Sequence, residues 1–103
     1  MPHIPLMISR YNACIDRLFC LRDVLIRHYD LAMHQDLAHR PDTRGLMKKL
    51  LNVFNLICCQ LSKSRPDVHV EYRLFQKRLQ ILNDKIDLIH YQLNGAIEAE
   101  FFN

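Results

Sequence analysis

The chain has 103 residues, of which 50% are apolar and 24% are charged, with two glycines, four prolines and a formal net charge of +3. This composition excludes a disordered tail or a collagen-like repeat, and two glycines are too few for a turn-rich β-sandwich. No apolar run reaches the roughly 18 residues of a membrane span, and the first residues do not form a signal peptide. We therefore expect one soluble, cytoplasmic, all-α domain that spans residues 1–103.

Two proline-containing breaks, at residues 40–45 and 64–67, divide the chain into three expected helices. The predicted helices span about 5–39, 43–63 and 66–94, and a tail follows at 95–103 because Gly95 weakens a helix. Ser64 and Asp67 have the spacing of a capping box, which favours a third helix that begins at Pro66. The predicted architecture is an antiparallel bundle.

Apolar residues in the first expected helix follow the spacing of a helical face that is buried in a core. The predicted positions of this face are Met7, Tyr11, Cys14, Leu18, Leu21, Leu25, His28 and Ala32. A second row of apolar residues runs beside them, and we name it the N-terminal strip: Ile8, Ile15, Phe19 and Ile26. The apolar surface is wider than one antiparallel neighbour covers.

The other two expected helices have the same pattern. In the second, the core positions are Met47, Leu50, Phe54, Ile57 and Leu61. In the third, an unbroken stripe contains Val68, Tyr72, Phe75, Leu79, Leu82, Ile86, Ile89 and Leu93. A second row at seven-residue intervals, named the C-terminal seam, consists of Leu74, Ile81 and Leu88.

Helix lengths predict that the second rows need a partner. The first and third helices reach about 45–50 Å, while the second reaches only about 30 Å. One short helix does not cover both rows, so we expect a homodimer built on the N-terminal strip and the C-terminal seam. The alternative is a four-helix monomer in which the first helix breaks near residues 29–35 and folds back.

Positive charge is concentrated in the middle of the chain. Residues 41–65 hold five basic residues against Asp42, whereas residues 66–103 hold four basic and six acidic residues. Three of the basic residues are candidate contacts for an anionic partner: Arg44, Lys48 and Lys49. No aromatic residue outside the expected core is interleaved with them, so nucleic-acid binding is not the favoured interpretation.

The four cysteines, Cys14, Cys20, Cys58 and Cys59, do not have the spacing of a metal knuckle, and no Cys-x-x-Cys occurs. We expect reduced, mostly buried thiols. His28, Asp30, His34 and His39 lie within twelve residues, but Asp30 and His34 share one face while His28 and His39 share a different one. We therefore expect no metal and no other cofactor.

A nucleophilic or phosphate-binding site is not expected, because no serine lies in a strand-turn-helix elbow and no glycine-rich loop occurs. The segment from Arg22 to His28, with five residues between the two, resembles the Arg-x(4–6)-His motif of the HEPN ribonucleases. The resemblance implies a helical dimer in which Arg22 and His28 cleave RNA at the dimer cleft.

The favoured interpretation is a non-enzymatic interaction protein that binds itself or another protein through apolar helix faces. Small adaptors, chaperones and inhibitors have this general form, which is an analogy at the level of the fold. The alternative is an RNA-cleaving or nucleic-acid-binding helical dimer.

Overall fold

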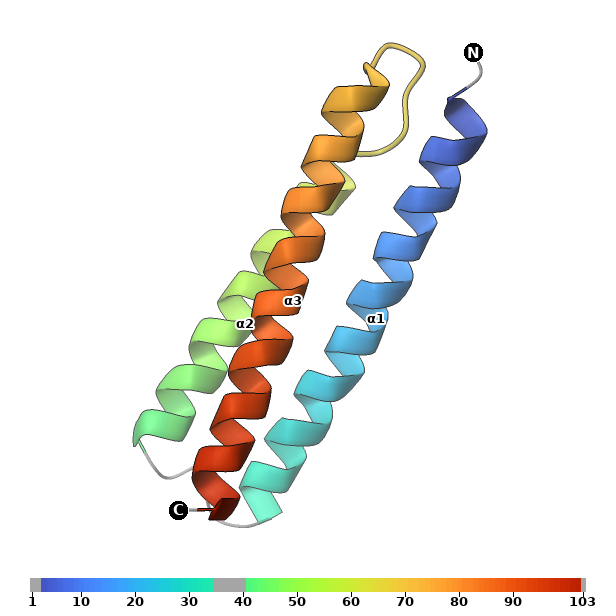
Figure 1. Ribbon diagram of the computed structural model, residues 1–103. Helices are drawn as coiled ribbons and strands as arrows, with labels where there is room; N and C mark the ends of the chain where they lie inside the picture. The colour runs from blue at the N-terminus through green and yellow to red at the C-terminus, as the bar shows by residue number, and fades with distance from the viewer. Residues whose placement is uncertain (1–2, 35–40, 103) are drawn as a thin grey trace.

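The computed structural model describes residues 3–34 and 41–102, with side chains at 3–30 and 45–95, as three helices. These are α1 (Ile4–His34), α2 (Pro41–Ser62) and α3 (Tyr72–Phe102). α1 and α3 run in the same direction and α2 runs in the opposite direction (Figure 1). Each helix packs against the other two in an elongated bundle of 53 × 21 × 17 Å. The predicted three-helix, all-α architecture is confirmed.

The core lies along the bundle axis and is formed by all three helices. Its fully buried side chains are Met7, Cys14, Leu18, Leu21 and Leu25 of α1, Leu50, Ile57 and Leu61 of α2, and Phe75, Leu79, Leu82, Ile86, Ile89 and Leu93 of α3. All belong to the predicted core positions. The prediction is wrong for Val68, which lies before α3 and is 51% exposed. Among the described side chains, no polar or charged residue is buried as a whole.

The third helix begins at Tyr72, six residues later than predicted. The Ser64 hydroxyl donates to the carbonyl of Gln60 (2.7 Å), so it completes the end of α2 and does not cap α3. Asp67 accepts from the backbone N–H of His69 (3.0 Å), which holds a turn in place of the first helical turn. Pro66 therefore lies in the connection, and the predicted capping box is wrong.

Tyr72, the first residue of α3, contacts α1 and the residue that precedes α1. The ring of Tyr72 stacks on His3 with the centroids 4.7 Å apart, and the guanidinium of Arg10 lies 5.9 Å from the Tyr72 ring centroid. Tyr11 of α1 donates its hydroxyl to the carbonyl of Leu61 near the end of α2 (2.9 Å). These contacts bring the end of α2 and both other helices together at one end of the bundle.

The other helix boundaries also differ from the prediction. α2 begins at Pro41 because proline is well suited to the first helical position, where its missing N–H has no partner. α3 continues through Gly95 to Phe102, so the predicted tail is wrong. The residues after Gly95 include Ala96, Glu98 and Ala99, which favour a helix and offset the cost of one glycine.

α1 is continuous to His34, so the helix does not break between Tyr29 and His34. The predicted last turn at 35–39 lies outside the described residues. In the part of the chain that the structure describes, no helix is both long and apolar enough to cross a membrane.

Candidate interaction surfaces

A groove between α1 and α2 has an almost entirely apolar lining. Its volume is about 260 Å³, and its walls are Leu25, Ile26 and Tyr29 of α1 and Met47, Leu51 and Phe54 of α2, with Arg22 at the edge. Ile26, Tyr29 and Leu51 are exposed to solvent although they belong to an apolar wall. The folded protomer therefore leaves this groove uncovered.

The N-terminal strip borders this groove. Ile26 lines it, and Phe19 precedes Ile26 by seven residues, or two helical turns, on the same side of α1. Phe19 and Ile26 are each 52% exposed and Ile8 is 46% exposed. Ile15 differs from the others because it is partly buried and packs against the core. Three of the four strip residues are thus available to a partner.

Charged residues of opposite sign lie at the outer edges of the two walls of the α1–α2 groove. Asp16, Asp23 and Asp30 recur every seven residues of α1, and each lies three or four residues from Phe19 or Ile26. On α2, Lys48 lies one turn before Leu51, and all four charged side chains are exposed. Three exposed aspartates therefore follow the outer edge of α1, with Arg22 and Arg27 beside them, and Lys48 lies on the outer edge of α2.

Arg22 lies at the edge of the groove and its charge is already compensated. Its guanidinium is 5.0 Å from the ring centroid of Phe19, and its Nη2 is 3.7 Å from a carboxylate oxygen of Asp23. Covering a cation that lies over an aromatic ring and beside a carboxylate costs less desolvation free energy than covering an isolated cation. Arg22 therefore does not prevent a partner from covering the groove.

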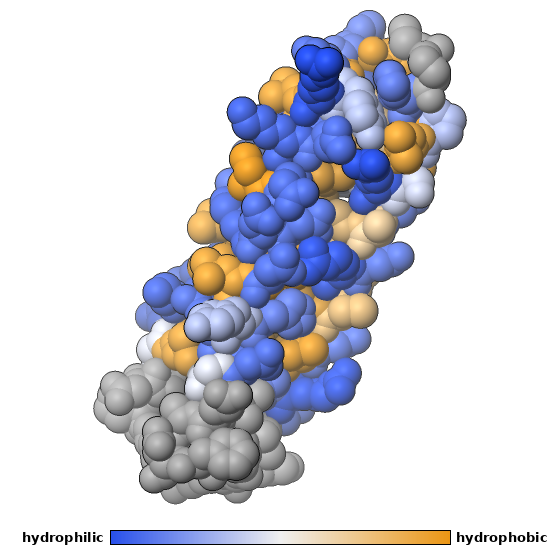
Figure 2. Space-filling model, in the orientation of Figure 1, coloured by the Kyte–Doolittle hydropathy of each residue, from blue (hydrophilic) through white to orange (hydrophobic). Residues whose placement is uncertain are grey.

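A second groove lies between α2 and α3 and has a volume of about 370 Å³. Ile81 of the C-terminal seam lines it, and Leu74 and Leu88 follow the same side of α3 at seven-residue intervals. The three seam residues are 44–55% exposed. Figure 2 shows hydrophobic side chains spaced between hydrophilic ones along the edge of the molecule where α2 and α3 lie.

The N-terminal strip and the C-terminal seam therefore border different grooves, on opposite sides of α2. A flat contact with one partner helix does not cover both, because α2 projects between them. The single dimer surface expected from the sequence divides into two separate surfaces.

The α2–α3 groove is basic. Lys63, directly after α2, and Arg78 and Lys85 of α3 line it, and its described lining residues contain no acidic side chain. The amine of Lys85 donates to the side-chain oxygen of Gln60 (3.2 Å), which leaves its charge unneutralised. Arg78 and Lys85 were not predicted from the sequence as contact residues, although their seven-residue spacing beside Ile81 indicates that they share one face of α3.

Lys48 and Lys49 of the predicted basic cluster are both exposed and point in different directions from α2. Adjacent helical residues point about 100° apart. Lys48 therefore lies with Leu51 on the α1 side of α2, while Lys49, three turns before Gln60, lies on the α3 side. The side chain of Arg44 lies outside the described residues.

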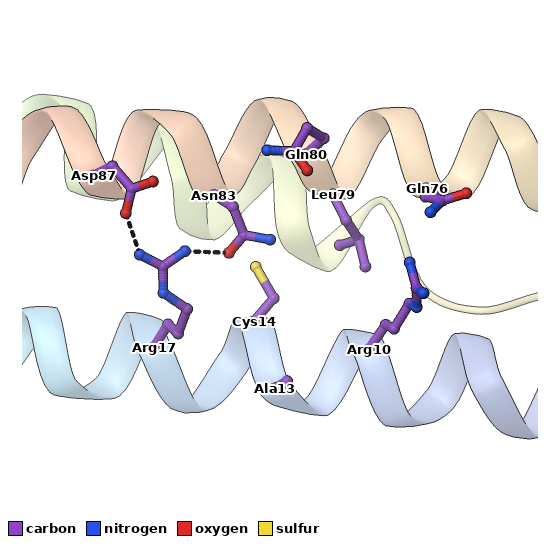
Figure 3. Close-up of a pocket in the computed structure, with 9 residues that line it drawn as sticks. All are labelled: Arg10, Ala13, Cys14, Arg17, Gln76, Leu79, Gln80, Asn83 and Asp87. Carbon is purple, nitrogen blue, oxygen red and sulfur yellow. Dashed lines mark hydrogen bonds and ion pairs between the residues drawn. The ribbon is translucent and has the colours of Figure 1, made fainter.

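A third groove lies between α1 and α3. A polar contact across this groove holds the two helices in register. The guanidinium of Arg17 reaches from α1 to α3, where it donates to Asn83 Oδ1 (2.7 Å) and to the carboxylate of Asp87 (Figure 3). Cys14 and Leu79 lie beside this contact. Because Arg17 and Asp87 satisfy each other, this groove has a structural rather than a binding character.

The residues of the ribonuclease-like motif do not meet within one protomer. Arg22 and His28 lie about 240° apart around the α1 axis, and Arg22 is on the α2 side. Nδ1 of His28 lies 2.7 Å from the carbonyl oxygen of Val24, so this ring nitrogen is the donor. Nε2 of His28 is buried and has no hydrogen-bond partner among the described residues.

The histidine-rich segment does not form a metal site in the described part of the chain. No group of three or more His, Cys, Asp or Glu side chains is arranged around a common point there. The side chains of His34 and His39 lie outside the described residues.

All four cysteines are free thiols, but only Cys14 is buried. The expectation of mostly buried thiols is wrong because Cys20 and Cys59 lie on the outer faces of α1 and α2. Burial raises the pKa of the Cys14 thiol, and the nearby charge of Arg17 opposes this effect only partly. Burial and then the neighbouring Cys59 raise the pKa of Cys58.

These environments predict a clear order of thiol reactivity. Alkylation by iodoacetamide at neutral pH requires a thiolate that the reagent reaches. We expect mass spectrometry to show rapid labelling of Cys20 and Cys59, slower labelling of Cys58 and the slowest labelling of Cys14. In denaturant the differences caused by burial should disappear. Native labelling of Cys14 at the rate of Cys20 would contradict the packing of α1 against α3.

Comparisons with protein-family models, with curated proteins and with solved structures found no match to this chain.

Proposed function

We propose that this chain is a non-enzymatic protein-interaction module that self-associates, with two copies meeting across the α1–α2 groove. The observation that carries the proposal is the uncovered apolar lining of this groove, together with the exposed N-terminal strip beside it. An adaptor, chaperone or inhibitor in the cytoplasm uses such a surface to hold its partner.

The energetics favour a partner with its own apolar helix face. Fully burying a large apolar side chain contributes about 1.5–3 kcal/mol. Phe19, Ile26, Tyr29 and Leu51 are each between 43% and 52% exposed, so each has about half of this contribution left to gain. Two copies bring eight such side chains to one interface, which is comparable to the cost of association, about 4–15 kcal/mol.

Charge complementarity supports a second copy as the partner. A twofold axis parallel to the helices places α1 of one copy against α2 of the other, at the same height along the bundle. The aspartates along the outer edge of α1 then face the lysine on the outer edge of α2. Tyr29 and Met47 line the same groove, so their neighbours Asp30 and Lys48 lie at similar heights. Asp30 of each copy therefore faces Lys48 of the other.

Sedimentation equilibrium at micromolar concentrations tests the self-association. We expect a species with twice the 12.3 kDa mass of the chain, in exchange with the monomer. A mass of 12.3 kDa at all concentrations would show that the chain does not self-associate.

A charge-reversal cycle tests the arrangement of the two copies. Asp30→Lys and Lys48→Asp each place like charges across the interface, so each should weaken the dimer by about tenfold. The double variant restores opposite charges and should recover the affinity. Lys77→Asp, an exposed reversal on α3, is the control and should change nothing. If the double variant self-associates more weakly than both single variants, the parallel twofold arrangement is wrong even if the protein is dimeric.

A further inference from the structure

We propose that the α2–α3 groove is a second docking surface, and that it binds an acidic amphipathic helix of a different protein. The proposal uses residues separate from the α1–α2 groove and does not depend on self-association. It follows from three properties of the groove: its shape, its apolar centre and its positive charge.

The groove has an apolar centre between two helices. Leu82 is buried and forms part of the floor, while Ile81 stands at the side and is 47% exposed. The exposed seam residues Leu74 and Leu88 continue this apolar row in both directions along α3. Leu56 of α2, which is 59% exposed, adds apolar surface on the opposite wall, because it lies one turn before Gln60. A groove with an apolar centre, continued by exposed apolar side chains along α3, fits the ridge of another helix.

The charged side chains that line this groove have one sign, and the exposed Asp84, one turn after Ile81, lies outside the lining. Lys63 stands on the α2 wall and Arg78 and Lys85 stand on the α3 wall, and none of the three is in an ion pair among the described residues. Lys49 extends the positive charge along α2 toward the other end of the groove. Three unpaired cations around an apolar centre attract a ligand with carboxylates on both sides of an apolar ridge.

The spacing of the cations fits a helix. Arg78 and Lys85 are seven residues apart, so their backbone positions are about 10 Å apart along α3. Two carboxylates seven residues apart on a partner helix have the same separation. The recognised segment therefore carries apolar residues at i, i+3 or i+4 and i+7, with Asp or Glu beside them.

The groove suits a helix better than a nucleic acid or a membrane. Its described lining has no aromatic side chain on which a base could stack. A phosphate backbone gains nothing from Ile81 and the seam residues. A membrane surface is flat, whereas the lysine and the two basic residues of α3 lie on opposite walls of a channel.

Fluorescence anisotropy with a designed peptide tests the proposal. The probe is a labelled amphipathic helix with leucines at the i, i+3 and i+7 positions and glutamates beside them. A scrambled peptide of the same composition is the matched control. We expect the ordered peptide to bind at least about tenfold more tightly than the scrambled one, and its binding to weaken as salt rises from about 50 to 200 mM.

Variants then assign the binding to the groove. Ile81→Asp and Lys85→Glu should each weaken binding of the ordered peptide by about tenfold or more, and Lys63→Glu provides the same test from the α2 wall. Arg27→Glu, which reverses an exposed cation on α1 and outside this groove, should retain binding. Circular dichroism confirms that each variant is folded.

Any one of four results would overturn the proposal. The first two are that the ordered peptide binds no better than the scrambled peptide, and that the groove variants bind the ordered peptide as well as the parent chain does. Alternatively, anionic vesicles or single-stranded RNA bind through Lys63 and Lys85 while the ordered peptide does not. Loss of self-association in Ile81→Asp would instead assign the groove to a second copy of this chain.

Discussion

Replacing Leu82 with alanine should lower the free energy of unfolding by about 2–5 kcal/mol. Leu82 is only 2% exposed and lies in the first half of α3, which packs against both other helices. A domain of this size is stabilised by about 5–15 kcal/mol in total, so the loss is a large part of it. Urea denaturation followed by circular dichroism, at a protein concentration low enough to keep the chain monomeric, measures the change.

The neighbouring residue provides a matched control. Ile81→Ala removes an aliphatic side chain of the same size from the adjacent position of the same helix, but Ile81 is 47% exposed in the protomer. We expect a loss of less than about 1 kcal/mol, because little buried surface and no cavity are created. Equal losses for the two variants would show that α3 is rotated relative to the described packing.

The sequence alone predicted which side of each helix is buried. Apolar residues at three- and four-residue intervals, such as Leu79, Leu82 and Ile86, lie on one face of a helix, and a helix in water buries that face. This reasoning also identified Phe19, Ile26 and Ile81 as apolar residues in excess of the core, and all three are exposed.

Helix ends were less predictable because competing local hydrogen bonds decide them. Ser64 has two available roles, as a cap for the next helix or as a donor to the previous one. The contact of Tyr72 with His3 and Arg10, far away in the sequence, determines where α3 begins. Such a contact is invisible until the three helices are placed together.

The arrangement of the two surfaces was also beyond the sequence. A helical pattern shows that the N-terminal strip lies beside the core face, but not whether α2 or α3 is the neighbour on that side. Bundles of either handedness satisfy the same pattern. Only the packed structure places Ile26 beside α2.

Ile26→Asp should abolish self-association, while Ile81→Asp should leave it intact. Ile26 lines the α1–α2 groove, where a second copy would surround the new carboxylate with apolar side chains and leave it unpaired. Burying an unpaired charge costs several kcal/mol, so we expect the dimer dissociation constant to rise by about a hundredfold or more. In the free protomer both positions are about half exposed, and neither substitution should unfold the chain.

Sedimentation equilibrium of the two variants at matched concentrations, with circular dichroism to verify folding, distinguishes the two surfaces. A monomeric Ile26→Asp and a dimeric Ile81→Asp would assign self-association to the α1–α2 groove and leave the basic α2–α3 groove free for an acidic helix. The opposite pattern would exchange the two assignments, because the C-terminal seam would then be the surface that a second copy covers. If both variants stay dimeric, neither groove forms the contact between copies, and the proposed self-association surface is wrong.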